Sequence, residues 1–429
     1  MKFISNQNNI NFRNFYNIAS NVQQNAVLNR SFIDAGGIFP WLIQSNNKEE
    51  RTERLINLST FFGFAFVAPV INVPAANRIS MRCQGLTDGL LDNNHKAVQI
   101  SNEFLTTDEN LLKGLDLYNK DKKFAPSPIE RLFSKKSNQI DIDKLLEKCQ
   151  NNPELLRKRL VKAKNWVLFS DLVITGVTLG SLGFLNNYLT KKRTGRSGFS
   201  AELNMADSKI IEQRSEKYEQ NKKRNMGKLA GIIMLVSAGV PFIVNRGMLS
   251  KNKNKFSEFI KNNAKYTDYT KGIFMSRFVM LLGIIMNMCG LLLASRNETE
   301  RKDWLIRCLV TNPIFLGGDL VTASLISNTC DKLFKTNLTE NDKNDKILRR
   351  IFPKVKSLEN INTEVENKKL SNIHKPLAAG VYWGHMLLCA YALAYIVPTI
   401  CNKMIKSDVD KYVHKQSAES QDYKSVSNT

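Results

Sequence analysis

The sequence predicts an all-α fold: a polytopic membrane helix bundle of about six spans, with helical extramembrane segments. Apolar residues are gathered into separate blocks, each close to the ~20 residues of helix that cross ~30 Å of hydrocarbon. Lys or Arg residues stand at or near the block ends, as they do at the flanks of membrane helices. The mean hydropathy of -0.28 is mildly polar only because Asn- and Lys-rich stretches separate the blocks.

The blocks cover residues 58–76, 166–185, 229–244, 278–294, 304–326 and 377–400. The first contains Pro69 and Pro74, and the third is short, so that a re-entrant hairpin is an alternative to a span. The predicted organisation is an amphipathic and juxtamembrane region (1–57), span 1 (58–76), an extramembrane helical region (77–165), a membrane region with spans 2–5 (166–326), a second extramembrane helical region (327–376), span 6 (377–401) and a polar disordered tail (402–429).

The strong positive charge fits the flanks of membrane helices better than a nucleic-acid surface. The chain has 62 Lys and Arg residues against 39 Asp and Glu, a net charge of +23. No helix-turn-helix, zinc-finger or RNA-recognition pattern accompanies this charge, so no nucleic-acid partner is expected. Lys and Arg are nearly equal in number on the two sides of the six blocks, which leaves the orientation open. We expect both ends in the cytoplasm and the cytoplasmic membrane as the location, because loop 190–228 is the most basic short loop.

Ionisable and polar residues inside the blocks are the candidates for a substrate or ion path. They are Asp171, Asn287, Arg307, Asp319 and His385. Charged groups are costly in hydrocarbon, so they usually face the bundle interior or water. Two plainer interpretations compete: Asp171 and Arg307 could reach the interface, and Asp319 could pair with a partner only to fix packing. His385 fits a satisfied packing residue better than a path residue.

Small residues at helical spacing predict close approach between helices. Gly176 and Gly180 stand four apart in the second block, and Gly380 and Gly384 in the sixth. We interpret both pairs as packing faces, with contact between the two pairs as one arrangement, because small residues let helix backbones approach closely in membranes.

A basic stretch follows the second block. Lys191, Lys192, Arg193 and Arg196 could hold anionic lipid head groups, although an ordinary basic flank explains them equally well. Within this stretch, residues 195–198 match the G-x-S-G string of rhomboid-type intramembrane serine proteases. The serine lies beyond the end of the apolar block, however, so the context argues against a protease.

One short motif occurs twice. Residues 47–56 and 297–306 share the frame N-x-x-E-R-x-[ED]-x-L-I, and each copy directly precedes an apolar block that contains a proline. A parallel internal repeat is one interpretation. Coincidence between two charged helix starts is the other, and we favour it because ten residues are few.

No catalytic residue, metal site or cofactor is predicted, since phosphate-binding, zinc-protease and dinucleotide motifs are missing and the seven cysteines form no C-x-x-C pair. An enzyme is therefore unsupported. The first functional hypothesis is a structural or interaction protein of the cytoplasmic membrane, with the lipid bilayer, anionic lipids and proteins as partners, the proteins held through 1–44 and 77–165. The alternative is a small transporter or channel-like protein whose Asp319 and Asp171 line a polar path. The Asn- and Lys-rich composition suggests an AT-rich, bacterial genome.

Overall fold

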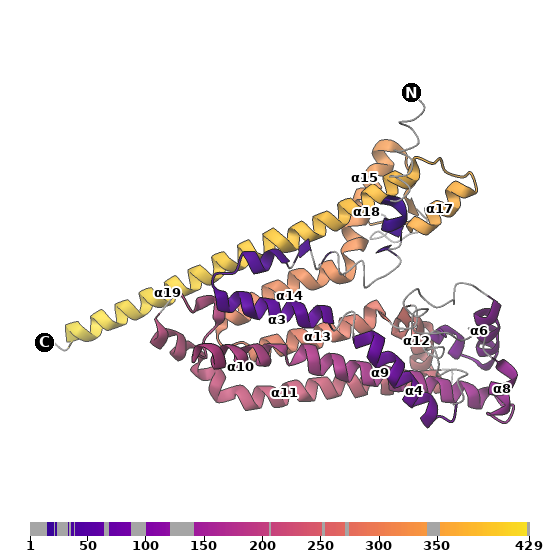
Figure 1. Cartoon of the computed structure of the whole chain (residues 1–429), viewed down its shortest axis with the longest axis horizontal. Helices are drawn as coiled ribbons and strands as arrows, with labels where there is room; N and C mark the ends of the chain where they lie inside the picture. The colour runs from indigo at the N-terminus through magenta and orange to yellow at the C-terminus, as the bar shows by residue number, and fades with distance from the viewer. Residues whose placement is uncertain are drawn as a thin grey trace. The chain divides into compact units, whose positions relative to one another are not determined.

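The computed structural model describes residues 15–20, 22–23, 33, 36–37, 39–63, 68–86, 100–120, 141–205, 207–250, 254–270, 274–340 and 352–426. The predicted all-α class is confirmed, because helices dominate the described residues and the strands found there form two short antiparallel ladders, each of two residues per strand. Figure 1 shows the helices along the chain.

The helices of the first half are α3 (Lys48–Phe62), α4 (Ala68–Cys83), α6 (Asp108–Lys120), α8 (Ile142–Glu147), α9 (Pro153–Gly180), α10 (Leu182–Thr194) and α11 (Ser208–Leu249), with the 3-10 turns η3 (Asn102–Leu105) and η5 (Ser200–Glu202). The second half holds α12 (Lys255–Asn262), η6 (Ala264–Thr267), β1 (Tyr269–Thr270), β2 (Phe274–Met275), α13 (Arg277–Ala294), α14 (Glu298–Gly318), the π turn η7 (Asp319–Ala323), α15 (Ser324–Phe334), β3 (Thr339–Glu340), β4 (Lys354–Val355), α17 (Leu358–Glu366), α18 (His374–Tyr391), the π turn η8 (Ala392–Ile396) and α19 (Val397–Val426).

The predicted number of six spans is not confirmed. Among the described residues, four helical segments are long and apolar enough to cross a membrane: Pro153–Thr194, Ser208–Leu249, Arg277–Ala294 and His374–Lys415. A fifth span is added if Glu298–Ile314 and Leu316–Phe334, which meet at an angle of 44°, together form one broken span. The chain is therefore an all-helical protein with four or five candidate membrane spans.

The third apolar block was predicted as a span and lies within a candidate span, whereas the described residues of the first block contain no candidate span. Block 58–76 is shared between α3 and α4, and neither is among the candidate spans. Pro74 lies inside α4, where it removes a backbone donor from the helix. Block 229–244, for which a re-entrant hairpin was an alternative, lies inside the single continuous helix α11 despite Pro241.

The chain end also differs from expectation. The sequence predicts a disordered tail over 402–429, but α19 runs to Val426. Its Lys, Gln, Ala and Glu residues are good helix formers, and this outweighs the polar composition.

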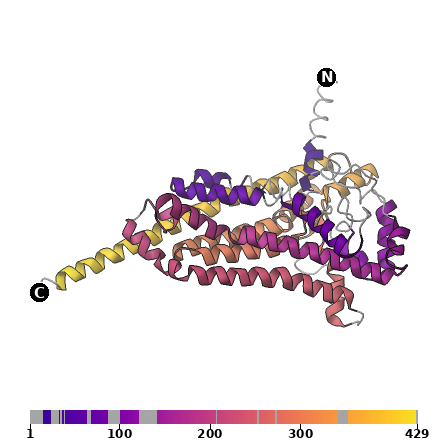
Figure 2. The same cartoon turned by 60° about the horizontal axis from the view of Figure 1, so that its bottom comes forward.

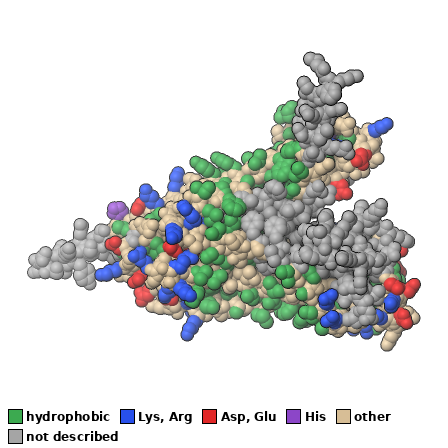
Figure 3. Space-filling model, viewed as in Figure 1, with side chains coloured by type: hydrophobic (Ala, Val, Ile, Leu, Met, Phe, Trp, Pro, Cys, Tyr) green, Lys and Arg blue, Asp and Glu red, His purple; other side chains and the backbone are tan. Residues whose placement is uncertain are grey.

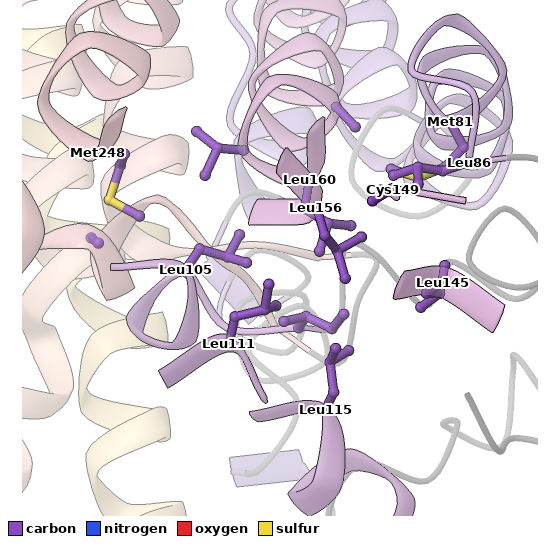
Figure 4. Packing of buried hydrophobic residues seen from close by; sticks show 14 of the residues in the cluster. Met81, Leu86, Leu105, Leu111, Leu115, Leu145, Cys149, Leu156, Leu160 and Met248 are labelled. Carbon is purple, nitrogen blue, oxygen red and sulfur yellow. The ribbon is translucent and has the colours of Figure 1, made fainter. Parts of the chain in front are cut away.

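The chain divides into two compact units. Unit 1 comprises residues 1–55, 196–215 and 296–429, and unit 2 comprises 56–195 and 216–295. In unit 2, α9, α10, α11 and α13 lie alongside one another (Figures 1 and 2) around a core that includes Leu172, Ile233 and Met286. A second unit 2 core lies where α6, α8 and α9 meet; Leu156 and Leu160 of α9 point into it, with Leu111 and Leu145 around them (Figure 4).

Helices α9 and α13 approach unusually closely. A Cβ added to Gly290 would stand 1.9 Å from the carbonyl oxygen of Gly180, and one added to Gly176 would stand 2.8 Å from the sulfur of Met286. Only glycine permits this distance between helix backbones. The predicted packing face at Gly176 and Gly180 is thus present, and it packs against α11 and α13 of unit 2.

Unit 1 has its own core, which includes Leu338, Ile361, Ala379 and Leu393. Gly380 and Gly384 lie on α18, and a Cβ added to either would meet no atom within 4 Å. These two glycines therefore do not form a packed face among the described residues.

Candidate functional site

The five predicted path residues are divided between the two units. Asp171 and Asn287 lie in unit 2, whereas Arg307, Asp319 and His385 lie in unit 1. Asp319 opens the π turn η7, but its side chain lies outside the described residues. Asn287 of α13 is partly buried, and its side-chain oxygen has no hydrogen-bond partner within the described part of the chain.

His385 contacts its own helix and a neighbouring element. Its side chain is fully buried, and Nδ1 lies in hydrogen-bond contact with Oγ1 of Thr322 and 3.5 Å from Sγ of Cys389. The same Thr322 hydroxyl donates 2.6 Å to the carbonyl oxygen of Gly318. The histidine thus joins α18 to the π turn that follows α14.

Asp171 is a buried carboxyl in α9 with neutral partners. Its side chain is 2 % exposed, one oxygen accepts from Nδ2 of Asn72 at 3.0 Å, and the other accepts from the hydroxyl of Tyr269 at 3.0 Å. No cation pairs with it among the described residues. Burial and the neighbouring carboxylate raise the pKa of Tyr269, so its phenol stays a donor. A lone charge at such a place is costly, which favours a carboxyl that holds a proton or a bound cation.

The largest polar assembly is a buried ionic cluster in unit 1. Every member lies next to a group of opposite charge, and all charged side chains in it are 9 % exposed or less. The members are Glu50, Glu53, Arg54, Glu202, Arg214, Arg296, Glu300, Asp303 and Arg307.

The two copies of the short motif form the two halves of this cluster, and they fold alike. In the first copy, Oδ1 of Asn47 accepts from the Glu50 amide at 2.9 Å, and the Glu50 carboxylate accepts from the Asn46 amide at 2.6 Å. In the second copy, Asn297 and Glu300 make the same two bonds at 2.9 and 2.6 Å. Each copy is thus a reciprocal cap at a helix start.

One arginine joins the two copies. The guanidinium of Arg296 makes two bonds to the Glu53 carboxylate, at 2.9 and 3.0 Å, and two to that of Glu300, at 3.0 and 2.8 Å. Burial alone would lower the pKa of Arg296, but the two carboxylates raise it above its usual range. Arg296 therefore remains charged and fixes the first copy against the second.

Arg307, a predicted path residue, belongs to the same cluster. Its Nε donates to both oxygens of Asp303 at 2.9 Å, and its guanidinium lies 4.6 Å from the ring centroid of Trp41. Arg54 pairs with Glu50 and donates to the Trp41 carbonyl oxygen. Burial and the nearby Arg307 lower the pKa of Arg54 to about 10.

A third segment of the chain, besides the two motif copies, contributes Glu202 of η5 to the cluster. Its carboxylate accepts from Nδ2 of Asn297 at 2.9 Å and lies 3.2 Å from Nη2 of Arg214. Burial raises the pKa of Glu202 to about 7, although Arg214 opposes the shift. The hydroxyl of Ser200, two residues earlier, donates to Glu53 at 2.7 Å. The cluster thus ties together three segments that are far apart in the sequence.

The predicted lipid-binding residues lie at the end of α10. Lys191, Lys192 and Arg193 form its last turn, which Gly195 ends in the left-handed conformation (φ 74°). Lys191 pairs with Glu219 of α11 at 3.0 Å. Figure 3 shows Lys and Arg side chains gathered toward the end of the view where α10 ends, with hydrophobic side chains along the helices beyond it.

Comparison with protein-family models, with curated proteins and with solved structures finds no match to this chain. The class of protein therefore rests on the fold alone: a helical protein whose long apolar helices indicate association with a membrane. The sequence did not predict the ionic cluster, although five of its residues lie in the repeated motif.

Proposed function

We propose that the chain is a structural or interaction protein of the cytoplasmic membrane. It would hold protein partners through 1–44 and 77–165, and its spans would stand in a bilayer with anionic lipids. The bilayer is the environment to which long apolar helices with basic flanks are suited.

The observation that carries this proposal is that the buried charges of unit 1 are paired with one another. Arg307, a candidate for a path, is held by Asp303 and stacked on Trp41, and the surrounding charges are paired with one another. Two interior cavities of the described residues are small, about 20 and 10 Å³, so that each holds about one water. Charges arranged in this way fix a fold, whereas a transport path needs groups that a substrate can reach.

One observation favours the alternative, a small transporter or channel-like protein. Asp171 lies in a candidate span with two neutral donors and no cationic partner within the described residues. Such a carboxyl can exchange a proton or a cation. In this alternative, Asp171 and Asp319 would line the polar path.

Flux across vesicles of the reconstituted full chain tests the proposal. Proton and sodium gradients would be imposed and their decay followed with internal dyes, for the natural chain and for Asp171→Asn and Asp319→Asn. The proposal expects decay at the rate of protein-free vesicles for all three proteins. Fast decay that Asp171→Asn abolishes in a folded protein would replace the proposal with the alternative.

A further inference from the structure

Unit 2 carries an open, largely apolar groove on its surface between α11 and α13. Its volume is about 530 Å³. Its lining is apolar except for a lysine at one side: Lys228, Gly231, Ile232, Leu235, Cys289, Leu292 and Leu293. Both helices are among the candidate membrane spans, and only 28 % of the apolar stretch of α11 is buried by the protein itself. The groove therefore opens on a surface suited to hydrocarbon.

The basic residues of α11 stand in line with this groove. Arg224, Lys228, Gly231 and Leu235 are spaced four, three and four apart, which places them on one face of the helix. Arg224 and Lys228 are exposed. The charged groups thus continue the line of the groove beyond its Lys228 end.

At the Lys228 end of the groove, the neighbouring helices α10 and α13 also end. Nδ2 of Asn225 donates to the carbonyl oxygen of Leu293 at 3.0 Å, one residue before α13 ends at Ala294. The last turn of α10 reaches the same region, since Lys191 pairs with Glu219 of α11. Charged helix ends of this kind lie at the head-group level of a bilayer, with the apolar lining extending from it into the hydrocarbon.

We propose that this groove is a binding site for one anionic glycerophospholipid. Its phosphate would pair with Arg224 and Lys228, and one acyl chain would lie along Gly231, Leu235 and Leu292. The absence of a side chain at Gly231 leaves room for the chain, because a Cβ added there would meet no atom within 4 Å. The proposal rests on the membrane setting of the proposed function and names its lipid partner.

The experiment counts lipids on the purified full chain by native mass spectrometry in detergent. Dioleoyl phosphatidylglycerol and dioleoyl phosphatidylcholine are titrated separately. Four proteins are compared: the natural chain, Gly231→Leu, Gly239→Leu and the double variant R224Q/K228Q. Gly239 is the matched control, since it lies in the same helix, is equally open and does not line the groove.

The proposal expects one phosphatidylglycerol bound to the natural chain and to Gly239→Leu, with a preference of roughly 10-fold over phosphatidylcholine, as two basic groups at a membrane surface provide. Gly231→Leu should lose this lipid, and R224Q/K228Q should lose the preference while it keeps the helix content of the natural chain.

Equal binding of the two lipids by the natural chain would overturn the proposal, and so would equal binding of phosphatidylglycerol by Gly231→Leu and Gly239→Leu. The proposal would also be overturned if the natural chain were a dimer and Gly231→Leu a monomer, because the groove would then bind a second copy of the chain. Lipid binding is measured independently of ion flux. A failure of the lipid proposal can therefore be told apart from a failure of the proposed function.

Discussion

Arg296 and Glu53, 243 residues apart in the chain, form a two-bonded ion pair that is almost completely buried. The pair joins the first copy of the repeated motif to the second. Because each copy also caps its own helix in the same way, the motif gives both the local geometry and the contact between the two copies. The shared conformation favours duplication over the coincidence that the sequence alone suggested.

Neutralising Glu53 should destabilise the protein strongly. In Glu53→Gln, the Arg296 guanidinium keeps Glu300 but loses its second carboxylate in a buried place, which costs about 3 kcal/mol. The measurement is the free energy of unfolding in detergent, followed by tryptophan fluorescence. The control is Glu340→Gln at the exposed pair with Lys354, where ~0–1 kcal/mol is expected. Equal losses in the two variants would show that burial does not set the strength of the pair.

The stability of the protein should fall as the pH rises through neutrality, because of Glu202. Its carboxyl has a pKa of about 7 in the folded chain against 4.5 in the unfolded chain. Between these values the folded chain binds more protons than the unfolded chain, so the free energy of unfolding decreases with pH, on the order of 3 kcal/mol in total.

The variant Glu202→Gln isolates this contribution, since it stays neutral at every pH. Unfolding midpoints of both proteins would be measured from pH 5 to pH 9. The natural chain should lose stability relative to the variant as the pH rises, because only its carboxyl ionises. Parallel pH profiles would mean that Glu202 is already ionised in the folded chain at pH 5.

A side chain at position 290 should destabilise the protein, because α9 and α13 approach closely there. Gly290→Ala places a methyl group 1.9 Å from a backbone oxygen of Gly180, so the helices must separate. Overpacking of this kind costs at least ~1–3 kcal/mol. Gly239→Ala is the control, where open space and higher helix propensity predict a gain of about 0.5–1 kcal/mol. Thermal midpoints that move in the same direction in both variants would contradict the packing of α9 on α13.

The donors around Asp171 should be needed for stability. Tyr269→Phe removes one of the two hydrogen bonds to the buried carboxyl, which costs about 1–3 kcal/mol. Tyr266→Phe is the matched control three residues earlier, because that tyrosine is 53 % exposed. Chemical unfolding curves of the two variants give the comparison. A loss that is no larger in Tyr269→Phe than in Tyr266→Phe would show that Asp171 does not depend on this donor.

The sequence predicted the helical class and the apolar helices because block length and basic flanks follow directly from bilayer dimensions. Block 58–76 was counted as a span for its apolar content, and its described residues lie in α3 and α4, neither of which is a candidate span. The ionic cluster could be anticipated only in part. Residues 47–56 and 297–306 matched as strings, but Glu202 and Arg214 enter from a segment that carries no related pattern, and only the folded chain brings them there.

Water accessibility at positions 171 and 319 tests the central claim most directly. Each residue would be replaced by cysteine in a background without the seven native cysteines and probed in open membrane fragments, where a membrane-impermeant thiol reagent reaches both faces. A cysteine at Lys192, exposed at the end of α10, is the control for labelling. The account predicts no labelling at 171 or 319 while position 192 is labelled rapidly, as a dry and packed interior requires. Rapid labelling at 319 or 171 would place that residue on an aqueous path and contradict the proposal of a structural or interaction protein.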